Sequence, residues 1–150
     1  MKISVKSVGF VFLFTCLCAF NAQARDARYF LSIKSAVKTG LADGRLGNDI
    51  GLYFGRQSHP PVNAMLARGI ITNKKTAKGN LDDKAACRRV MLSALIQLQE
   101  RARNEGGNAV INIKSYYKKR TFSSERQYEC GSGAVFSGVT LKGDVVRLRH

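Results

Sequence analysis

The alternation of apolar and polar positions predicts one long helix in the second half of the chain. Between residues 87 and 102 apolar side chains recur three or four positions apart, which is the spacing of a helix with one buried face. Asp82 or Asp83 can cap its first turn and complement the positive end of the helix dipole. Gly106-Gly107 ends the helix, because glycine adopts the left-handed conformation beyond a helix at little cost.

Shorter apolar segments on either side predict strands. A strand that runs into a helical turn is expected over 28–38, and further strands over 50–54, 65–72, 109–117, 127–141 and 145–148. Segments rich in glycine, proline, asparagine or lysine predict turns and loops over 39–48, 55–63, 74–81 and 118–126. This order predicts an α+β fold in which one long helix packs on an antiparallel sheet.

The first 24 residues have the pattern of a secretory signal peptide. Lys2 and Lys6 precede an apolar stretch over 8–20, and Ala22-Gln23-Ala24 forms a small-x-small cleavage pattern. The apolar stretch is too short to cross a bilayer core of roughly 30 Å as a helix. We therefore expect a signal peptide followed by a single basic α+β domain over 25–150, with no transmembrane anchor and a periplasmic or secreted location.

Two cysteines remain after such a signal peptide is removed. Cys16 and Cys18 leave with it, and neither follows the small residues of a lipobox. Cys87 and Cys130 form an even pair in an exported domain, which predicts a disulfide that fastens the helix to a returning strand. Closing a loop of this length stabilises the fold by about 4 kcal/mol. Two buried free thiols are the alternative, and two thiols alone make a poor zinc site.

The chain is strongly basic. Its formal net charge is +15, and loss of the two signal-peptide lysines leaves 15 − 2 = +13. Such a charge accelerates association with polyanions. In a periplasm these are lipopolysaccharide, anionic lipid headgroups and acidic wall polymers, and outside the cell nucleic acid is added. A generic basic surface without a dedicated ligand is the alternative.

Basic and aromatic residues concentrate where a hairpin is expected near residue 120. Cations beside rings that can stack suit single-stranded nucleic acid or a phosphorylated glycan. The alternative is structural, because aromatic residues are common in strands and lysines protect sheet edges. The candidate anion-binding residues are Tyr116, Tyr117, Lys118, Lys119, Arg120, Phe122, Arg126 and Tyr128, with Lys74, Lys75 and Lys78 expected to join the same face.

No pattern of catalytic residues stands out. His59 lies beside two prolines and His150 ends the sequence, and neither has a neighbour that would make it a base or a ligand. The segment Gly131-Ser132-Gly133 is not a nucleophile elbow, and no Gly-x-x-x-x-Gly-Lys-Ser/Thr phosphate loop occurs. Glu129 is expected to be a surface acid of its strand. We therefore expect a non-enzyme without a cofactor, and a metal site that combines His59 with acids and thiols stays as an alternative.

Several segments carry a family resemblance, which covers roughly residues 72–143. They are Thr72-Asn73-Lys74-Lys75-Thr76, the helix 86–102, Gly107-Asn108-Ala109-Val110-Ile111-Asn112-Ile113, Ser115-Tyr116-Tyr117-Lys118, Tyr128-Glu129-Cys130 and Gly133-Ala134-Val135. The chain here resembles small secreted proteobacterial proteins that often bear the label "excinuclease ATPase subunit". The helix followed by Gly-Asn-Ala-Val and a hairpin is also similar to YbjQ-like domains and to the stress-sensing lipoprotein RcsF, although the lipobox of an RcsF-type lipoprotein is missing.

These resemblances imply a compact α+β domain that oligomerises or senses the state of the envelope, with a disulfide in the RcsF case. Together with the charge, they predict a non-enzymatic exported envelope protein that binds an anionic envelope component or acts in envelope-stress sensing. An oligomerising interaction module and a secreted nucleic-acid-binding protein are the two alternatives.

Overall fold

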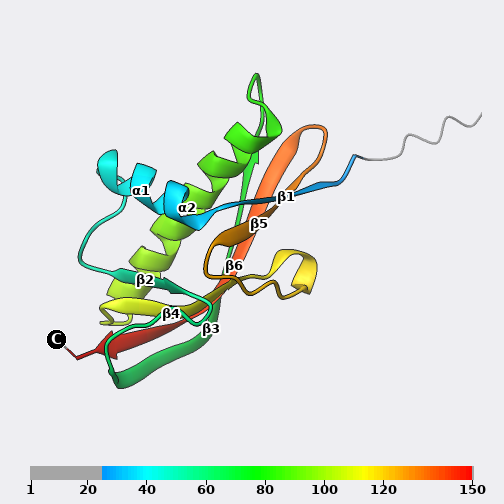
Figure 1. Ribbon diagram of the computed structural model, residues 1–150. Helices are drawn as coiled ribbons and strands as arrows, with labels where there is room; N and C mark the ends of the chain where they lie inside the picture. The colour runs from blue at the N-terminus through cyan, green and yellow to red at the C-terminus, as the bar shows by residue number, and fades with distance from the viewer. Residues whose placement is uncertain (1–24, 150) are drawn as a thin grey trace, which may run out of the picture.

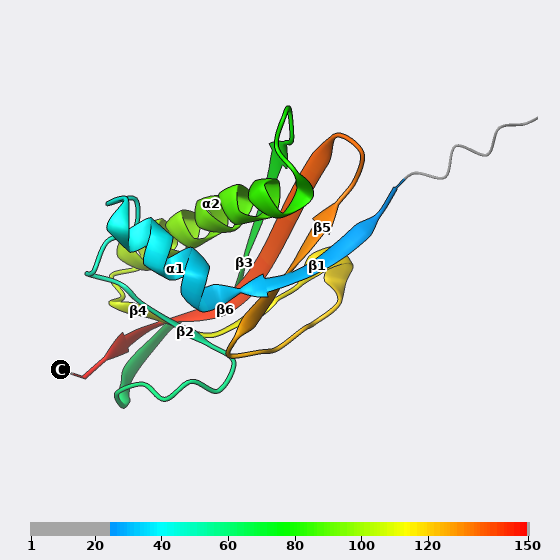
Figure 2. The same cartoon turned by 45° about the horizontal axis from the view of Figure 1, so that its top comes forward.

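The computed structural model describes residues 25–149, so the predicted signal peptide and His150 lie outside the described residues. The elements along the chain are β1 (Ala27–Ser32), α1 (Ile33–Ala42), β2 (Gly51–Phe54), β3 (Val62–Ala77), α2 (Asp83–Asn104), β4 (Ala109–Ser115), the short 3₁₀ turn η1 (Tyr117–Lys119), β5 (Gln127–Ser132) and β6 (Phe136–Leu148). Within this range six strands form one sheet, and both helices lie on the same face of it (Figures 1 and 2).

The predicted α+β fold is confirmed, with two corrections. A second, shorter helix, α1, packs beside α2, and β2 runs parallel to β4 in an otherwise antiparallel sheet. Residues 39–42 belong to α1 rather than to a turn. Gly40 permits close contact between the helices, because a β-carbon there would lie 2.6 Å from Leu92 Cδ1. The glycine that suggested a turn therefore serves helix packing.

Helix α2 follows the predicted pattern. Asp82 is the N-cap and accepts a hydrogen bond from the Ala85 amide at 2.7 Å. Gly106, at φ 75°, follows the last turn, as the sequence predicted for the end of the helix. The face turned to the sheet is fully buried and includes Cys87, Val90, Met91, Ala94, Leu95, Leu98 and Ala102.

Strand β6 is the centre of the sheet. It pairs with β3 from Val62↔Leu148 to Ala77↔Phe136, while β4 and β5 share its other edge. The prediction of one strand over 127–141 is wrong, because a turn closed by the Gly133 amide and the Phe136 carbonyl at 2.8 Å divides it into β5 and β6. Residues 74–77 continue β3 instead of forming a turn, since their backbone pairs with β6 despite the polar side chains.

The predicted hairpin around residue 120 is also wrong. Strand β4 pairs with β2 and β6, whereas β5 pairs with β1 and β6, so 116–126 is a crossing segment between two strands that do not form a ladder. The segment contains η1 and an isolated bridge between Ser115 and Phe122. Tyr117 of η1 packs against Gly131 of β5, so this part of the segment lies over the sheet.

The disulfide is confirmed. Cys87 of α2 and Cys130 of β5 are bonded, with a distance of 5.9 Å between their Cα atoms, and both are fully buried. The bond fastens the long helix to the sheet, as predicted. Among residues 25–149 there is no helix with the length and apolar character needed to cross a membrane.

Candidate functional site

The sheet has one face covered by helices and one that carries the crossing segment. Side chains alternate along β5, so Tyr128 and Cys130 point to α2 while Glu129 and Gly131 lie on the other side. The Tyr128 hydroxyl donates to the Cys87 carbonyl at 3.3 Å. We call the side opposite the helices the open face.

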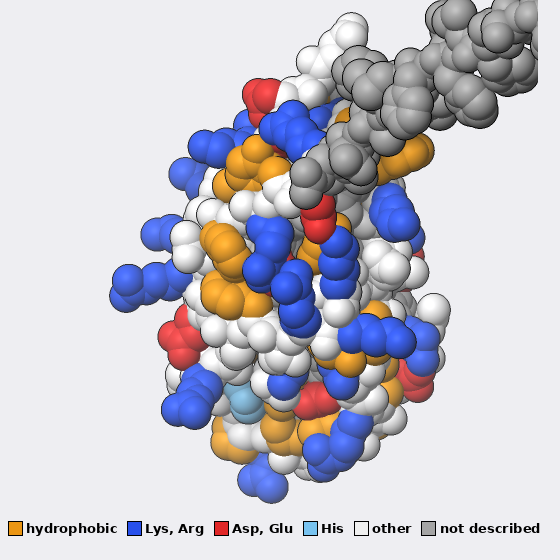
Figure 3. Space-filling view, turned by 90° about the vertical axis from the view of Figure 1, so that its right-hand side faces the viewer, with side chains coloured by type: hydrophobic (Ala, Val, Ile, Leu, Met, Phe, Trp, Pro, Cys, Tyr) orange, Lys and Arg blue, Asp and Glu red, His pale blue; other side chains and the backbone are white. Residues whose placement is uncertain are grey.

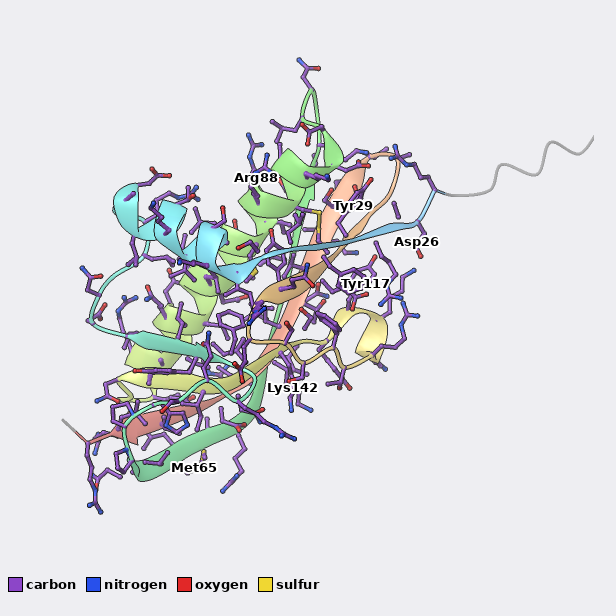
Figure 4. The ribbon with its side chains drawn as sticks, in the orientation of Figure 1. Asp26, Tyr29, Met65, Arg88, Tyr117 and Lys142 are labelled. Atoms are coloured by element: carbon purple, nitrogen blue, oxygen red, sulfur yellow. A yellow bond between two sulfur atoms is a disulfide. The ribbon has the colours of Figure 1, made fainter. Side chains whose placement is uncertain are left out.

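The Tyr117 ring packs against a glycine of the open face. A β-carbon at Gly131 would come within 2.0 Å of Tyr117 Cζ, and one at Gly138 within 3.9 Å of Tyr117 Cε2. The ring therefore needs a residue without a side chain at Gly131, whereas the distance at Gly138 is an ordinary contact. Figure 4 shows Tyr117 at η1, next to β5.

A pocket of about 460 Å³ opens beside this ring, and we call it the basic pocket. Tyr117 and Phe136 supply aromatic walls, Gly131 and Gly138 line it between them, and cationic side chains are contributed by Lys75, Lys118 and Arg25. These residues come from β3, η1, β5, β6 and the residues before β1. Lys75, Tyr117 and Lys118, all predicted from the sequence, therefore meet at one place.

The charges of the basic pocket differ in how far they are neutralised. Lys118 forms an ion pair with Asp26, which raises the pKa of the Lys118 ammonium, and its Nζ lies 5.5 Å from the Tyr117 ring centroid. Arg25 pairs with Asp83 at 2.5 Å. Lys75 is exposed and forms no ion pair with any residue between 25 and 149. Its charge is available to a ligand.

Figure 3 views the molecule from the side on which η1 lies in Figure 1. Lys and Arg side chains gather across this side, with hydrophobic side chains between them and few acidic ones. The basic pocket therefore belongs to a broader cationic surface, which the net charge of the sequence indicated without locating it.

The backbone of η1 is strained at its two lysines. Lys118 and Lys119 have φ of 50° and 60°, in the left-handed region that costs a residue with a β-carbon about 1 kcal/mol. The turn is closed by the Arg120 amide, which donates to the Tyr117 carbonyl at 3.0 Å. Strain of this kind is concentrated at functional sites. No sequence signal indicates it, because lysine is not a residue typical of left-handed turns.

Four of the other predicted residues lie on the cationic side in varied roles. Lys119 and Arg120 are exposed in the same segment without lining the pocket. The Tyr116 ring lies 4.9 Å from Lys142 Nζ, a cation of the open face that the sequence did not single out. Phe122 packs edge-on against Phe30 with ring centroids 4.8 Å apart.

The remaining four predicted residues lie elsewhere. Lys74 pairs with Val139, whose side chain is in the core, so it does not face the basic pocket. Tyr128 is buried among the core residues, and burial raises its pKa. Arg126 lines a separate pocket of about 520 Å³ between α1 and β2. Lys78 is only 11% exposed and is held by Asp83. The prediction of one shared face for all of these residues is therefore not met.

Asp83 is the centre of a polar cluster that the sequence did not indicate. Its carboxylate accepts hydrogen bonds from Lys78 Nζ and the Tyr29 hydroxyl, both at 2.6 Å, and from Ser132 Oγ at 2.9 Å. The bond from Lys78, followed by those from Tyr29 and Ser132, lowers the pKa of Asp83 well below its ordinary value. The cluster joins β1, the start of α2 and β5 beside the basic pocket, so its role is structural.

Glu129 is fully buried, which corrects the expectation of a surface acid. One oxygen accepts a hydrogen bond from Arg28 Nε at 2.6 Å, and the other has no partner among the described residues. Between residues 25 and 149 no group of three or more His, Cys, Asp and Glu side chains is placed to hold a metal ion. His59 lies in the loop before β3, with its Nδ1 2.8 Å from the Pro60 carbonyl oxygen.

No family model, curated protein or solved structure matches the chain. The resemblances drawn from residues 72–143 therefore stay predictions, and the case for a function rests on the geometry of the open face.

Proposed function

We propose that this chain is an exported, non-enzymatic domain that binds phosphate groups of an anionic envelope component in the basic pocket. The observation that carries the proposal is the meeting of Lys75, Lys118 and Tyr117, from separate elements, around one recess of the open face. Its volume is in the range of small-ligand sites and suits a single head group rather than a folded polymer. The lysines attract the phosphate, and the Tyr117 ring packs against the attached sugar or glycerol.

Export is the part of the proposal that rests on the sequence. The signal-peptide pattern of the first 24 residues supports it, and the disulfide supports it independently because such bonds persist in oxidising compartments. The intact mass of the protein purified from a periplasmic fraction tests it. A mass that begins at Arg25 and is two hydrogens light agrees with export, and a full-length chain with free thiols contradicts it.

Binding is tested with soluble polyphosphate as the probe, by isothermal titration calorimetry at low and high salt. Lys75→Ala/Lys118→Ala is compared with Lys34→Ala/Lys38→Ala, which removes the same charge from the exposed side of α1. We expect the pocket variant to lose about tenfold or more in affinity and the α1 variant about twofold or less. An equal loss in both variants would show a generic basic surface and overturn the proposal, as would no binding at low salt. Single-stranded DNA in the same assay tests the nucleic-acid alternative, for which affinity should be higher and fall steeply with salt.

One observation favours the alternative of an oligomerising module. Strand β3 is 16 residues long and pairs only with β6 in the described part of the chain, so its other edge has unpaired backbone groups. Sedimentation velocity over a wide concentration range tests this. A dimer that is weakened by Ile71→Lys, on the exposed side of β3, supports the alternative, and a monomer at every concentration ends it.

A further inference from the structure

The turn between β5 and β6 exposes two adjacent apolar side chains. Val135 is 60% exposed and Phe136 is 56% exposed, more than any other large hydrophobic residue of the described chain. Figures 1 and 2 both show this turn at one end of the sheet, projecting clear of α1. Exposed apolar side chains next to one another are costly in water, and they indicate contact with an apolar medium.

Lys78 fixes the turn through both its backbone amide and its side chain. The Lys78 amide donates to the Val135 carbonyl at 2.9 Å, and Lys78 Nζ donates to the Gly133 carbonyl at 2.8 Å. Lys78 is itself fixed by its ion pair with Asp83 at 2.6 Å. The two apolar side chains are therefore presented by a braced turn, so little conformational entropy is lost when they are inserted elsewhere.

The apolar turn is continuous with the basic pocket, because Phe136 is one of the pocket walls. Lys75 and Lys118 line the same pocket, and Lys75 pairs through its backbone with Gly138, two residues along β6 from Phe136. An apolar projection thus stands directly beside cations, one of which, Lys75, has no acidic partner in the described range.

We propose that the β5–β6 turn inserts into the surface of an anionic lipid bilayer, with Val135 and Phe136 among the lipid chains and Lys75 and Lys118 at the lipid phosphates. This rests on the proposed function and names the lipid membrane as the source of the phosphate groups. A bilayer interface accepts a small apolar projection surrounded by cations, and each lysine near an anionic leaflet adds to the attraction. A stable protein partner would need a contact area of about 800 Å² on each side, far more than two side chains at a turn provide.

The first experiment measures co-sedimentation with vesicles of phosphatidylcholine, with and without phosphatidylglycerol. Val135→Ser/Phe136→Ser is compared with Leu41→Ser/Val62→Ser, two exposed apolar positions away from the turn. We expect binding only to the anionic vesicles, with about a tenfold or greater loss of affinity in the turn variant and about a twofold or smaller loss in the control. Equal binding of wild type and turn variant would overturn the inference.

The second experiment uses the absence of tryptophan from the sequence. Phe136→Trp places the only tryptophan of the protein at the turn. Its fluorescence emission should shift to shorter wavelength with anionic vesicles but not with soluble polyphosphate. Leu41→Trp should show no shift in either case. If polyphosphate still binds through Lys75 and Lys118 while the indole emission stays unshifted with vesicles, the membrane inference fails and the proposed function stands. If neither probe binds, both fail.

Discussion

Because the Tyr117 ring packs against Gly131, the effect of Gly131→Ala on the free energy of unfolding should depend on whether the ring is present. The substitution should destabilise the protein that has Tyr117 and stabilise the protein that has alanine there. In Gly131→Ala the new β-carbon would lie 2.0 Å from Tyr117 Cζ and 2.1 Å from the hydroxyl oxygen. Ordinary contacts are about 3.5–4.0 Å, so the ring has to move by roughly 1.5–2 Å and leave its place on the sheet. Overpacking of this kind costs typically 1–3 kcal/mol, and we expect the free energy of unfolding to fall by about 2 kcal/mol.

In a Tyr117→Ala background the same substitution should stabilise the protein. The ring is gone, and alanine in a strand is favoured over glycine by roughly 0.5–1 kcal/mol, because less backbone entropy is lost on folding. Urea unfolding of the four proteins gives the coupling energy, which we expect to be about 2–3 kcal/mol. Gly138→Ala in β6 is the matched control, since its nearest neighbour, the Lys74 carbonyl oxygen, is 3.5 Å away and Tyr117 Cε2 is at 3.9 Å, both ordinary contacts. Equal effects of Gly131→Ala in both backgrounds would refute the seating of the ring.

Three further predictions follow from the disulfide, the strained turn η1 and the polar cluster around Asp83. Replacing Cys87 and Cys130 by alanine should lower the free energy of unfolding by about 4 kcal/mol, and reductant should reproduce the loss in urea unfolding of the wild type only. Lys119→Gly should raise the free energy of unfolding by about 1 kcal/mol, because φ of 60° costs glycine nothing, and should change polyphosphate affinity by about twofold or less, because Lys119 does not line the basic pocket; lower stability would contradict the strain. The hydrogen bond from Lys78 lowers the pKa of Asp83, so this carboxylate stabilises the fold above its unfolded pKa of about 4 and loses that contribution as the pH falls toward the folded value. The urea concentration at the unfolding midpoint of the wild type should therefore fall more steeply below about pH 4 than that of Asp83→Asn. Parallel curves would show that Asp83 makes no such pH-dependent contribution.

The part of the fold that the sequence predicted is the part governed by local periodicity. Helix α2 has its apolar positions, its Asp82 cap and its glycine end within one continuous segment, so every signal for it is local. The disulfide was predicted from the even number of cysteines left after the signal peptide and from the expected oxidising compartment. In contrast, the division of 127–141 depends on a turn in which Ala134 and Val135 carry no turn signal, and the break is visible only in the antiparallel pairing of β5 with β6.

The candidate site was predictable in composition but not in arrangement. Lys75, Tyr117 and Lys118 stood out as cations and a ring, and they do meet. Phe136 was missed, because an apolar residue in an expected strand predicts burial, and its exposure depends on a turn that projects from the sheet. Lys78 was included because charge alone does not reveal that a lysine is already neutralised by an aspartate five positions later.

The central position of β6 determines when this protein can fold. Three strands that come earlier in the sequence, β3, β4 and β5, all form ladders with residues 136–148. During synthesis the sheet therefore lacks its central strand until residues 136–148 have been made, and its long-range contacts form slowly after that. If the protein is exported as proposed, this delay keeps Cys87 and Cys130 from being buried before they reach an oxidising compartment.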